Sequence, residues 1–394
     1  MDPRKNPYAP GAGTPPPELA GRDELIERAA IALDRIRAGR AARSLILHGL
    51  RGVGKTVLLN RIETDAEARE FVCMKVEAPE ERSLPAILIP ALRVAMLRLD
   101  RGKRVRANLA KAGRALAGFA KALKVKYKDI EVTTDFEPER GLADSGDLDT
   151  DLTDLLASIG SAAHEYRTAV VLFIDELQYV REDQLASLIR ALHSASQRQL
   201  PITMLAAGLP QLIGRMGRAK SYAERLFEFI PIDRLDDTAA RAALSVPAEK
   251  EGVAFAQEAI AEILRHTMGY PYFLQEWGRH AWDVADASPI SRADARRGTR
   301  LALAELDAGF FRVRFDRLTP TEKRYLRAMA ELGPGPHRSG DIAERLGKIV
   351  TSVAPVRSEL IAKGMIYSPA HGDTAFTVPL FDGFMKRTMP EMPQ

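Results

Sequence analysis

Cysteine is nearly absent from this 394-residue chain, which has Cys73 alone. A disulfide needs two cysteines, so a disulfide framework within the chain is excluded, and a single thiol fits a reducing compartment. No apolar run approaches the ~18 residues that a membrane span requires. Residues 1–24 also lack the apolar core of a signal peptide. These absences predict a cytoplasmic protein without a membrane span.

Metal-ligand and nucleophile motifs are missing as well. The seven histidines are scattered and, with one cysteine, form no metal-ligand spacing. No G-x-S-x-G or similar nucleophile motif is present. The net charge of +4 does not by itself predict a nucleic-acid binder. The composition, with 46% apolar and 28% charged residues, is that of a globular protein, and the length predicts two or three domains.

A phosphate-binding loop is the clearest feature that is present. Residues 44–56, SLILHGLRGVGKT, join a short apolar strand to the spacing Gly49…Gly54-Lys55-Thr56, and a helical pattern follows. Glycines let backbone N–H groups curl around a phosphate, the lysine reaches the β- and γ-phosphates, and the threonine hydroxyl holds Mg²⁺. The helix N-terminus adds a favourable dipole. The motif predicts an ATP site made by Gly49, Leu50, Arg51, Gly52, Val53, Gly54, Lys55, Thr56 and Val57.

A second motif, AVVLFIDELQ, ends an apolar strand with two carboxylates. Asp175 is placed to hold Mg²⁺, and Glu176 is placed to polarise the attacking water. The alternative for Glu176 is a side chain that only faces solvent at the strand end. Together the two motifs predict a site that hydrolyses Mg–ATP, with Lys55 and Glu176 catalytic and with Thr56 and Asp175 as metal ligands.

The order of apolar patterns predicts an α/β fold of the P-loop NTPase type. Strand-like runs at 71–76, 169–174 and 202–207 alternate with helical patterns, which indicates a parallel sheet with helices on both faces. Helices alone follow, and then three helices and a β-hairpin predict a winged helix-turn-helix. The predicted divisions are an N-terminal extension at 1–40, an ATPase core at 41–233, a helical lid at 234–312 and a winged helix at 316–394.

A charged insert at about 98–154 interrupts the core. Residues 98–128 carry eleven Lys or Arg and one acid on an amphipathic helical pattern, and residues 129–154 carry ten acids and one Arg. One interpretation is a solvated helix docked on its own domain, with its charge offset by the acidic segment. The alternatives are contact with nucleic acid, with a protein partner or with an anionic membrane surface.

The predicted winged helix suggests contact with double-stranded DNA. In a helix-turn-helix the second helix enters the major groove, where a few side chains reach base edges. The candidate DNA-contacting residues are Ser352, Arg357 and Lys363 on that helix, with Arg338 and Lys348 nearby for phosphates. A role as a protein-interaction module is the alternative.

Four stretches of the chain resemble the AAA+ and STAND classes of P-loop ATPases. GLRGVGKT and LFIDELQ match the Walker A and Walker B motifs. PPPELAGRDELI, with Gly21 and Arg22 at its centre, is similar to the box that borders the adenine, and MGYPYFLQE is similar to a lid motif in which Pro271 packs near the base. The resemblance is greatest to the branch that links archaeal-type ATPases with origin-recognition initiators.

The departures from this family pattern concern the residues that sense phosphate. The stretch MLAAGLP lacks the polar side chain that AAA+ enzymes place after the strand that follows Walker B, and Tyr272 stands where initiators have an arginine. Arg279 is a substitute candidate. Arg225 resembles a γ-phosphate-sensing or finger arginine, and its alternative is a surface ion pair.

These features predict a slow ATPase that acts as a switch. The first hypothesis is a DNA-associated, initiator-like ATPase that binds ATP or ADP and Mg²⁺. The second is a STAND-type regulator whose winged helix and basic insert bind protein, and the third is a loader that remodels a partner. A finger role for Arg225 predicts a nucleotide-dependent homo-oligomer.

Overall fold

Two compact units make up the chain in this computed structural model, which describes residues 1–11, 13–79, 81–99, 106–130 and 136–391. The core unit comprises Arg22–Gly49 and Lys55–Ile232. The helical unit comprises Met1–Gly21, Leu50–Gly54 and Asp233–Gln394. None of the helices in the described ranges is both long and apolar enough to cross a membrane.

The core unit is built on a five-stranded parallel sheet with the order β2-β3-β4-β1-β5. Strands β3 and β4 are buried along their whole length, which explains why their sequences are unbroken apolar runs. The three predicted strands and the parallel α/β fold are confirmed, with small shifts in the strand bounds. The strands are β1 (Ser44–His48), β2 (Val72–Glu77), β3 (Val170–Asp175), β4 (Ile202–Gly208) and β5 (Phe227–Pro231).

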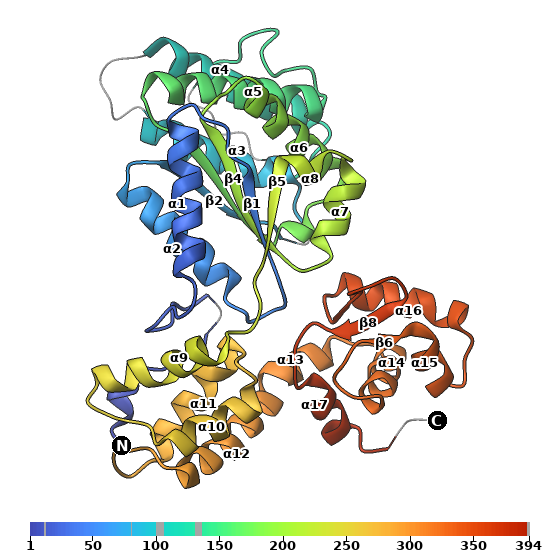
Figure 1. Cartoon of the computed structure of the whole chain (residues 1–394). Helices are drawn as coiled ribbons and strands as arrows, with labels where there is room; N and C mark the ends of the chain where they lie inside the picture. The colour runs from blue at the N-terminus through green and yellow to red at the C-terminus, as the bar shows by residue number, and fades with distance from the viewer. Residues whose placement is uncertain (12, 80, 100–105, 131–135, 392–394) are drawn as a thin grey trace. The chain divides into compact units, whose positions relative to one another are not determined.

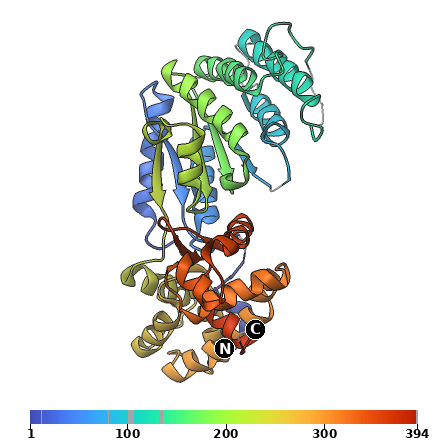
Figure 2. The same cartoon turned by 90° about the vertical axis from the view of Figure 1, so that its right-hand side faces the viewer.

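Helices cover both faces of this sheet (Figures 1 and 2). Helices α1 and α2 pack together on one face, and α5 and α6 pack together on the other. The carboxyl ends of the parallel strands share one edge, where α/β folds bind their ligands. The helices of the unit are α1 (Asp23–Arg37), α2 (Lys55–Ala68), α3 (Leu84–Leu99), α4 (Arg106–Lys124), α5 (Leu148–Glu165), α6 (Glu182–Gln197), α7 (Leu212–Ala219) and α8 (Ala223–Leu226), with the 3-10 turn η2 (Leu177–Tyr179) after β3.

The basic helix predicted in the insert is α4, and it is docked on its own unit. It packs against α3 and α5. Its predicted apolar face is fully buried, as expected: the residues are Leu109, Ala112, Leu116, Phe119 and Leu123. Arg114 pairs with Glu139 of the acidic segment at 2.6 Å, whereas Lys111, Lys121 and Lys124 are exposed. Lys103, which the amphipathic pattern of the sequence also predicts on the polar face, lies outside the described residues.

The helical unit begins with four packed helices, on which the N-terminal segment also lies. Residues 1–11 and 13–17 are irregular apart from the short turn η1 (Pro3–Lys5), but this segment is anchored: Tyr8 is buried, and Trp282 Nε1 donates to Asp2 O at 3.1 Å. A Cβ on Gly278 would lie 2.7 Å from Tyr8 Cδ1, so the glycine makes room for the tyrosine. The four helices are α9 (Asp237–Lys250), α10 (Gln257–Thr267), α11 (Pro271–Val284) and α12 (Arg292–Ala308).

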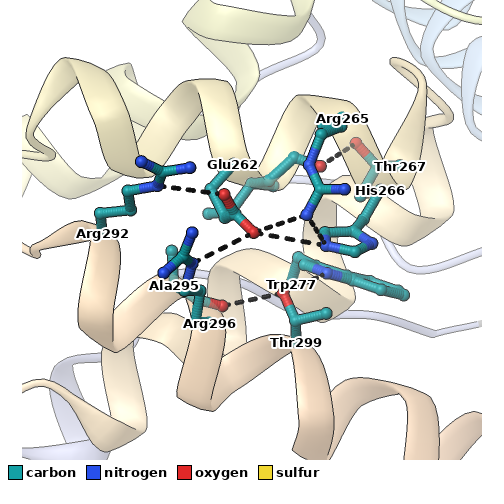
Figure 3. Close-up of polar contacts among 10 residues, drawn as sticks. Glu262, Arg265, His266, Thr267, Trp277, Arg292, Ala295, Arg296 and Thr299 are labelled. Atoms are coloured by element: carbon teal, nitrogen blue, oxygen red, sulfur yellow. Dashed lines mark hydrogen bonds and ion pairs between the residues drawn. The ribbon is translucent and has the colours of Figure 1, made fainter.

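A buried carboxylate on α10 joins this helix to α12 (Figure 3). Glu262 pairs with Arg265 of its own helix at 2.7 Å, and with Arg292 and Arg296 of α12 at 3.2 and 3.6 Å. The hydrogen bond from Arg265, with support from the other arginines, lowers the pKa of Glu262 to about 2. The carboxylate therefore stays ionised and holds several guanidinium groups in place at the α10–α12 contact.

The remainder of the helical unit combines helices with a small antiparallel sheet of order β6-β8-β7. Thr319 caps α14 in a capping box with Glu322, and Pro320 is its first residue. Gly347 and Gly364 follow α15 and α16 with positive φ. The elements are α13 (Phe310–Asp316), α14 (Pro320–Glu331), β6 (His337–Arg338), α15 (Ser339–Arg345), α16 (Val350–Ala362), β7 (Ile366–Tyr367), β8 (Asp373–Phe376) and α17 (Phe381–Thr388).

Candidate functional site

The phosphate-binding loop leaves the carboxyl end of β1 and leads directly into α2. Gly52 and Gly54 have φ angles of +83° and +90°, a conformation that L side chains rarely adopt. Two left-handed glycines in a short loop can turn successive N–H groups toward one point, which is the geometry that binds a phosphate. The backbone conformation therefore favours glycine at positions 52 and 54.

Lys55 and Thr56 form the first turn of α2, where the helix N-terminus favours negative charge. The lysine is only 7% exposed, and its Nζ donates to Gly49 O at 3.0 Å. A buried ammonium needs acceptors, so this lysine is held beside the loop and not in bulk solvent. The arrangement places one fixed positive charge at the point where the loop meets the helix.

The two predicted metal ligands lie together in the core unit. Thr56 Oγ1 donates to Asp175 Oδ2 at 2.6 Å, although 119 positions separate these residues in the chain. Asp175 ends β3, is 6% exposed and accepts the N–H of Glu176 through Oδ1 at 2.8 Å. A hydroxyl beside a carboxylate is an all-oxygen donor set of the kind that Mg²⁺ uses, with phosphate and water supplying its other ligands. The residues present thus fit Mg²⁺.

Glu176 follows Asp175 in a left-handed backbone conformation, with φ at +52°. This conformation is uncommon for a residue with a side chain and turns the chain sharply after β3. The side chain is half-buried, and its Oε2 accepts a hydrogen bond from Gln178 Nε2. Sequence reasoning quoted Gln178 within LFIDELQ but gave it no role.

The predicted sensor position after β4 has no polar side chain. Ala206, Ala207 and Gly208 end the strand, and Thr203 lies earlier, where its hydroxyl is 3.2 Å from that of Ser44. The backbone N–H of Leu209 donates instead to Gln178 Oε1 at 3.0 Å. A polar group therefore does reach the end of β4, but it comes from η2 and not from β4.

The lid motif around Pro271 contacts the loop backbone within the helical unit. Pro271 is the first residue of α11, and the residues on either side of it reach the loop. The Tyr270 hydroxyl donates to Arg51 O, and Tyr272 N donates to Gly52 O at 3.2 Å. A Cβ on Gly52 would lie 3.1 Å from both tyrosines, so glycine also permits this close approach.

The predicted adenine-bordering pair is found at the start of α1. Gly21 has φ at +67°, and a Cβ there would lie 2.7 Å from Ala239 Cβ. Arg22 is half-buried and is the N-cap residue of α1, where its carbonyl accepts the N–H of Leu25. Gly21 therefore has a clear backbone reason to be glycine.

The candidate phosphate-sensing arginines have different surroundings. Arg225 is exposed on α8, immediately before β5. Arg279, the substitute candidate, is committed to two carboxylates, because its Nη2 lies 3.1 Å from Glu276 and 2.6 Å from Glu305. Arg225 is exposed and could contact another molecule, whereas Arg279 would first have to break its ion pairs with Glu276 and Glu305.

Sequence reasoning missed Arg314 on α13. Its guanidinium lies over the Phe310 ring at 3.9 Å, and its Nη1 donates to Phe310 O at 2.6 Å. Burial and the nearby positive charge of Arg51 lower the pKa of Arg314 to about 10. No motif in the sequence includes this residue, which lies 43 positions after Pro271.

The candidate DNA-contacting residues divide into two groups. Arg357 donates to Thr374 Oγ1, Ser368 Oγ and Asp373 O, each at 2.9 Å, and Lys363 Nζ donates to Glu322 at 2.8 Å. These two side chains hold the hairpin and α14 in place. The exposed group consists of Arg338, Lys348 and Ser352.

Residues 18–205 match the family model of the AAA ATPase domain. The match spans the phosphate-binding loop and the Asp175–Glu176 pair and ends within β4. Over this segment the chain is therefore similar to AAA+ P-loop ATPase domains.

Solved structures resemble the chain beyond the ATPase domain. The Walker-type ATPase PABY2304 of Pyrococcus abyssi is 16% identical, with 95% of this chain and 97% of that chain covered and a TM-score of 0.61. The Orc1 protein of Aeropyrum pernix, solved in complex with DNA, is 16% identical with 94% and 93% covered and a TM-score of 0.47. The RuvB Holliday junction branch migration motor of Thermotoga maritima is 15% identical, with 90% and 92% covered and a TM-score of 0.45. At this identity the first match shows a shared fold alone, and the other two are too distant in structure to add to it.

A second family model matches the end of the chain. Residues 308–385, from the last residue of α12 into α17, match a domain of unknown function, DUF8462. No curated protein matches the chain. The ATPase domain is therefore followed, after α9–α12, by a region whose family gives no activity.

Proposed function

We propose that the protein binds Mg–ATP, hydrolyses it slowly and uses the nucleotide state as a switch. The observation that carries this proposal is the 2.6 Å hydrogen bond between Thr56 and Asp175 beside the buried Lys55. Lys55 binds the β- and γ-phosphates, while Thr56 and Asp175 hold Mg²⁺. Mg²⁺, when bound, supplies positive charge that offsets the charge of the phosphate oxygens.

Glu176 is the proposed general base of this site. It follows the Mg²⁺-holding Asp175 directly, and its left-handed backbone turns it out of the strand direction. The carboxylate accepts a hydrogen bond from the attacking water and so directs a water lone pair toward the γ-phosphorus. The loop N–H groups and Lys55 stabilise the charge that develops on the phosphate oxygens, because their positions are fixed before the reaction.

Slow turnover is proposed because, among the described residues, few side chains are placed to sense the γ-phosphate. The end of β4 offers no polar side chain of its own, and Arg279 is held by Glu276 and Glu305. We expect phosphate release from Mg–ATP at a turnover well below the ~10 s⁻¹ that is typical of enzymes. Chelation of Mg²⁺ with EDTA is expected to stop release. Phosphate release that is unchanged by EDTA would contradict the proposed Mg²⁺ site.

The α14–β8 region supports a further proposal, a winged helix that binds DNA. Three helices, a three-stranded antiparallel sheet and the hairpin between β7 and β8 are the elements of that motif. Arg338, Lys348 and Ser352 are exposed on or beside the proposed recognition helix α16. The protein-binding alternative, as in STAND-type regulators or partner-remodelling loaders, also has support: Ile349 is 72% exposed and Val350 is 48% exposed at the start of the same helix.

A comparison of ADP with a non-hydrolysable ATP analogue tests the switch. We expect DNA affinity at low salt to depend on the nucleotide, and the double variant Arg338→Ala/Lys348→Ala to lower the slope of log affinity against log salt by about 1–2. Arg198→Ala removes an exposed arginine at the end of α6 and is the control. If the protein with the ATP analogue has no DNA affinity at low salt, the DNA proposal fails and the protein-binding alternative replaces it.

The same samples test the proposed role of Arg225 in trans. An exposed finger arginine that completes the site of a neighbouring copy predicts that the ATP analogue increases the particle size and that turnover rises with protein concentration. Turnover that is independent of concentration, together with an unchanged particle size, would contradict this role.

A further inference from the structure

A buried amide lies between Glu176 and the end of β4. Gln178, in the turn η2, is 3% exposed. Its Nε2 donates to Glu176 Oε2, and its Oε1 accepts the N–H of Leu209 at 3.0 Å. The reverse amide orientation would place oxygen against a carboxylate and N–H against N–H. The chemistry of the two neighbours therefore fixes the orientation of the amide.

The end of β4 is shaped to admit this amide. A Cβ on Gly208 would lie 2.8 Å from Gln178 Oε1 and 2.7 Å from Leu212 Cδ2, so a larger residue would displace the glutamine. The carbonyl of Gly208 also accepts the N–H of Gly49 at 3.2 Å. One strand end thus hydrogen-bonds both the amide that holds Glu176 and the first residue of the phosphate-binding loop.

We propose that Gln178 is a positioning residue that sets the orientation of the Glu176 carboxylate relative to the end of β4. The inference rests on the proposed function, in which Glu176 polarises the attacking water. A hydrogen bond to one carboxylate oxygen restricts the rotation of the group, and with it the directions that the other oxygen can take. A general base must present its lone pair within hydrogen-bond reach of the water, so its orientation affects the rate directly.

Removal of the amide is expected to lower kcat without weakening ATP binding. Gln178→Met keeps the length and the apolar contacts of the side chain but removes both hydrogen bonds. We expect kcat to fall about 10–100-fold, the usual effect of losing a group that orients a reacting ligand. The KM for ATP and the affinity of ATP measured by titration stay near those of the wild type, because Gln178 is not among the residues proposed to bind the nucleotide.

A second variant separates the donor from the acceptor. Gln178→Glu keeps the size of the side chain and an oxygen that can accept the Leu209 N–H, but it replaces the donor by a second carboxylate facing Glu176. A merely structural role predicts a loss of thermal stability, because the new carboxylate is buried, with kcat of the folded variant near that of the wild type. A positioning role predicts a fall in kcat equal to or larger than that of Gln178→Met, because two like charges push the carboxylates apart.

Gln184→Met is the matched control. Gln184 is also a buried glutamine of the core unit, and its Oε1 also accepts a backbone N–H, that of Leu84, at 2.8 Å. It lies on α6 and is not a member of the proposed site. We expect a comparable loss of thermal stability with kcat unchanged.

The outcomes separate this inference from the proposed function. If wild-type protein hydrolyses ATP, Glu176→Gln does not, and both Gln178 variants keep the wild-type kcat, the inference is wrong and the function survives. An equal fall in kcat for Gln184→Met and Gln178→Met also overturns it, because a general loss of stability then explains both. Absence of hydrolysis in the wild type with Mg–ATP overturns the function and this inference together.

Discussion

Lys55→Ala is expected to remove most of the affinity for ATP. The ammonium group is buried at the start of α2 and is the fixed positive charge nearest the loop carbonyl of Gly49. Truncation of one partner in a desolvated charge pair costs about 2–5 kcal/mol, which corresponds to roughly a 30- to 4,000-fold loss of affinity. Titration calorimetry with ATP and Mg²⁺ measures this change directly.

Lys75→Ala is the control for this variant. Lys75 lies on β2 of the same unit, and its ammonium is held by Glu63 at 3.2 Å and by Asn60. Like Lys55, Lys75 is a lysine whose ammonium group has partners within the protein. It lies about twenty positions after the phosphate-binding loop in the sequence. ATP affinity in the Lys75→Ala variant is expected to equal that of the wild type. If the Lys55→Ala variant bound ATP with the affinity of the wild type, the proposed role of Lys55 in ATP binding would be wrong.

Glu176→Gln is expected to bind ATP and to fail to hydrolyse it. The substitution keeps the size of the side chain but removes the charge that polarises water, and loss of a general base lowers the rate about 10²–10⁴-fold. Binding is expected to be retained because Lys55, Thr56 and Asp175 are unchanged. Phosphate release, measured beside ATP affinity in the same preparation, separates the two effects.

Glu182→Gln is a suitable comparison for that variant. Glu182 is an exposed acid at the start of α6, six positions beyond Glu176, and its carboxylate lies 3.6 Å from Arg218. We expect hydrolysis at the wild-type rate after this change. Equal hydrolysis by Glu176→Gln and Glu182→Gln would mean that another group activates the water.

The sheet could be predicted from the sequence because its strands are buried on both faces. A strand such as β3 has no polar face, so it appears as a continuous apolar run that ends at Asp175. The start of α14 follows from the sequence as well, because Thr319, Pro320 and Glu322 have the local spacing of a helix N-terminus. The anchoring of Tyr8 against Gly278 could not be predicted, because it depends on contact between residues 270 positions apart.

Part of the candidate site could be predicted from the sequence. The part that could not be predicted consists of side-chain contacts, and there is a physical reason for this. Motif spacing identifies Thr56 and Asp175, whose hydrogen bond then follows from the fold. Spacing does not reveal what a side chain contacts, so Gln178 had no predicted role despite its place in the Walker B motif. For the same reason Arg357 appeared free to contact DNA, whereas the structure engages it with Thr374 and its neighbours.

A single-turnover experiment with radiolabelled ATP tests the central proposal most directly. Wild-type protein and Glu176→Gln, each in excess over ATP and with Mg²⁺, are quenched over time and the nucleotide is separated. We expect the wild type to convert its bound ATP to ADP, whereas Glu176→Gln retains bound ATP. Conversion at equal rates in both proteins, or no ATP bound by either, would contradict the proposed function.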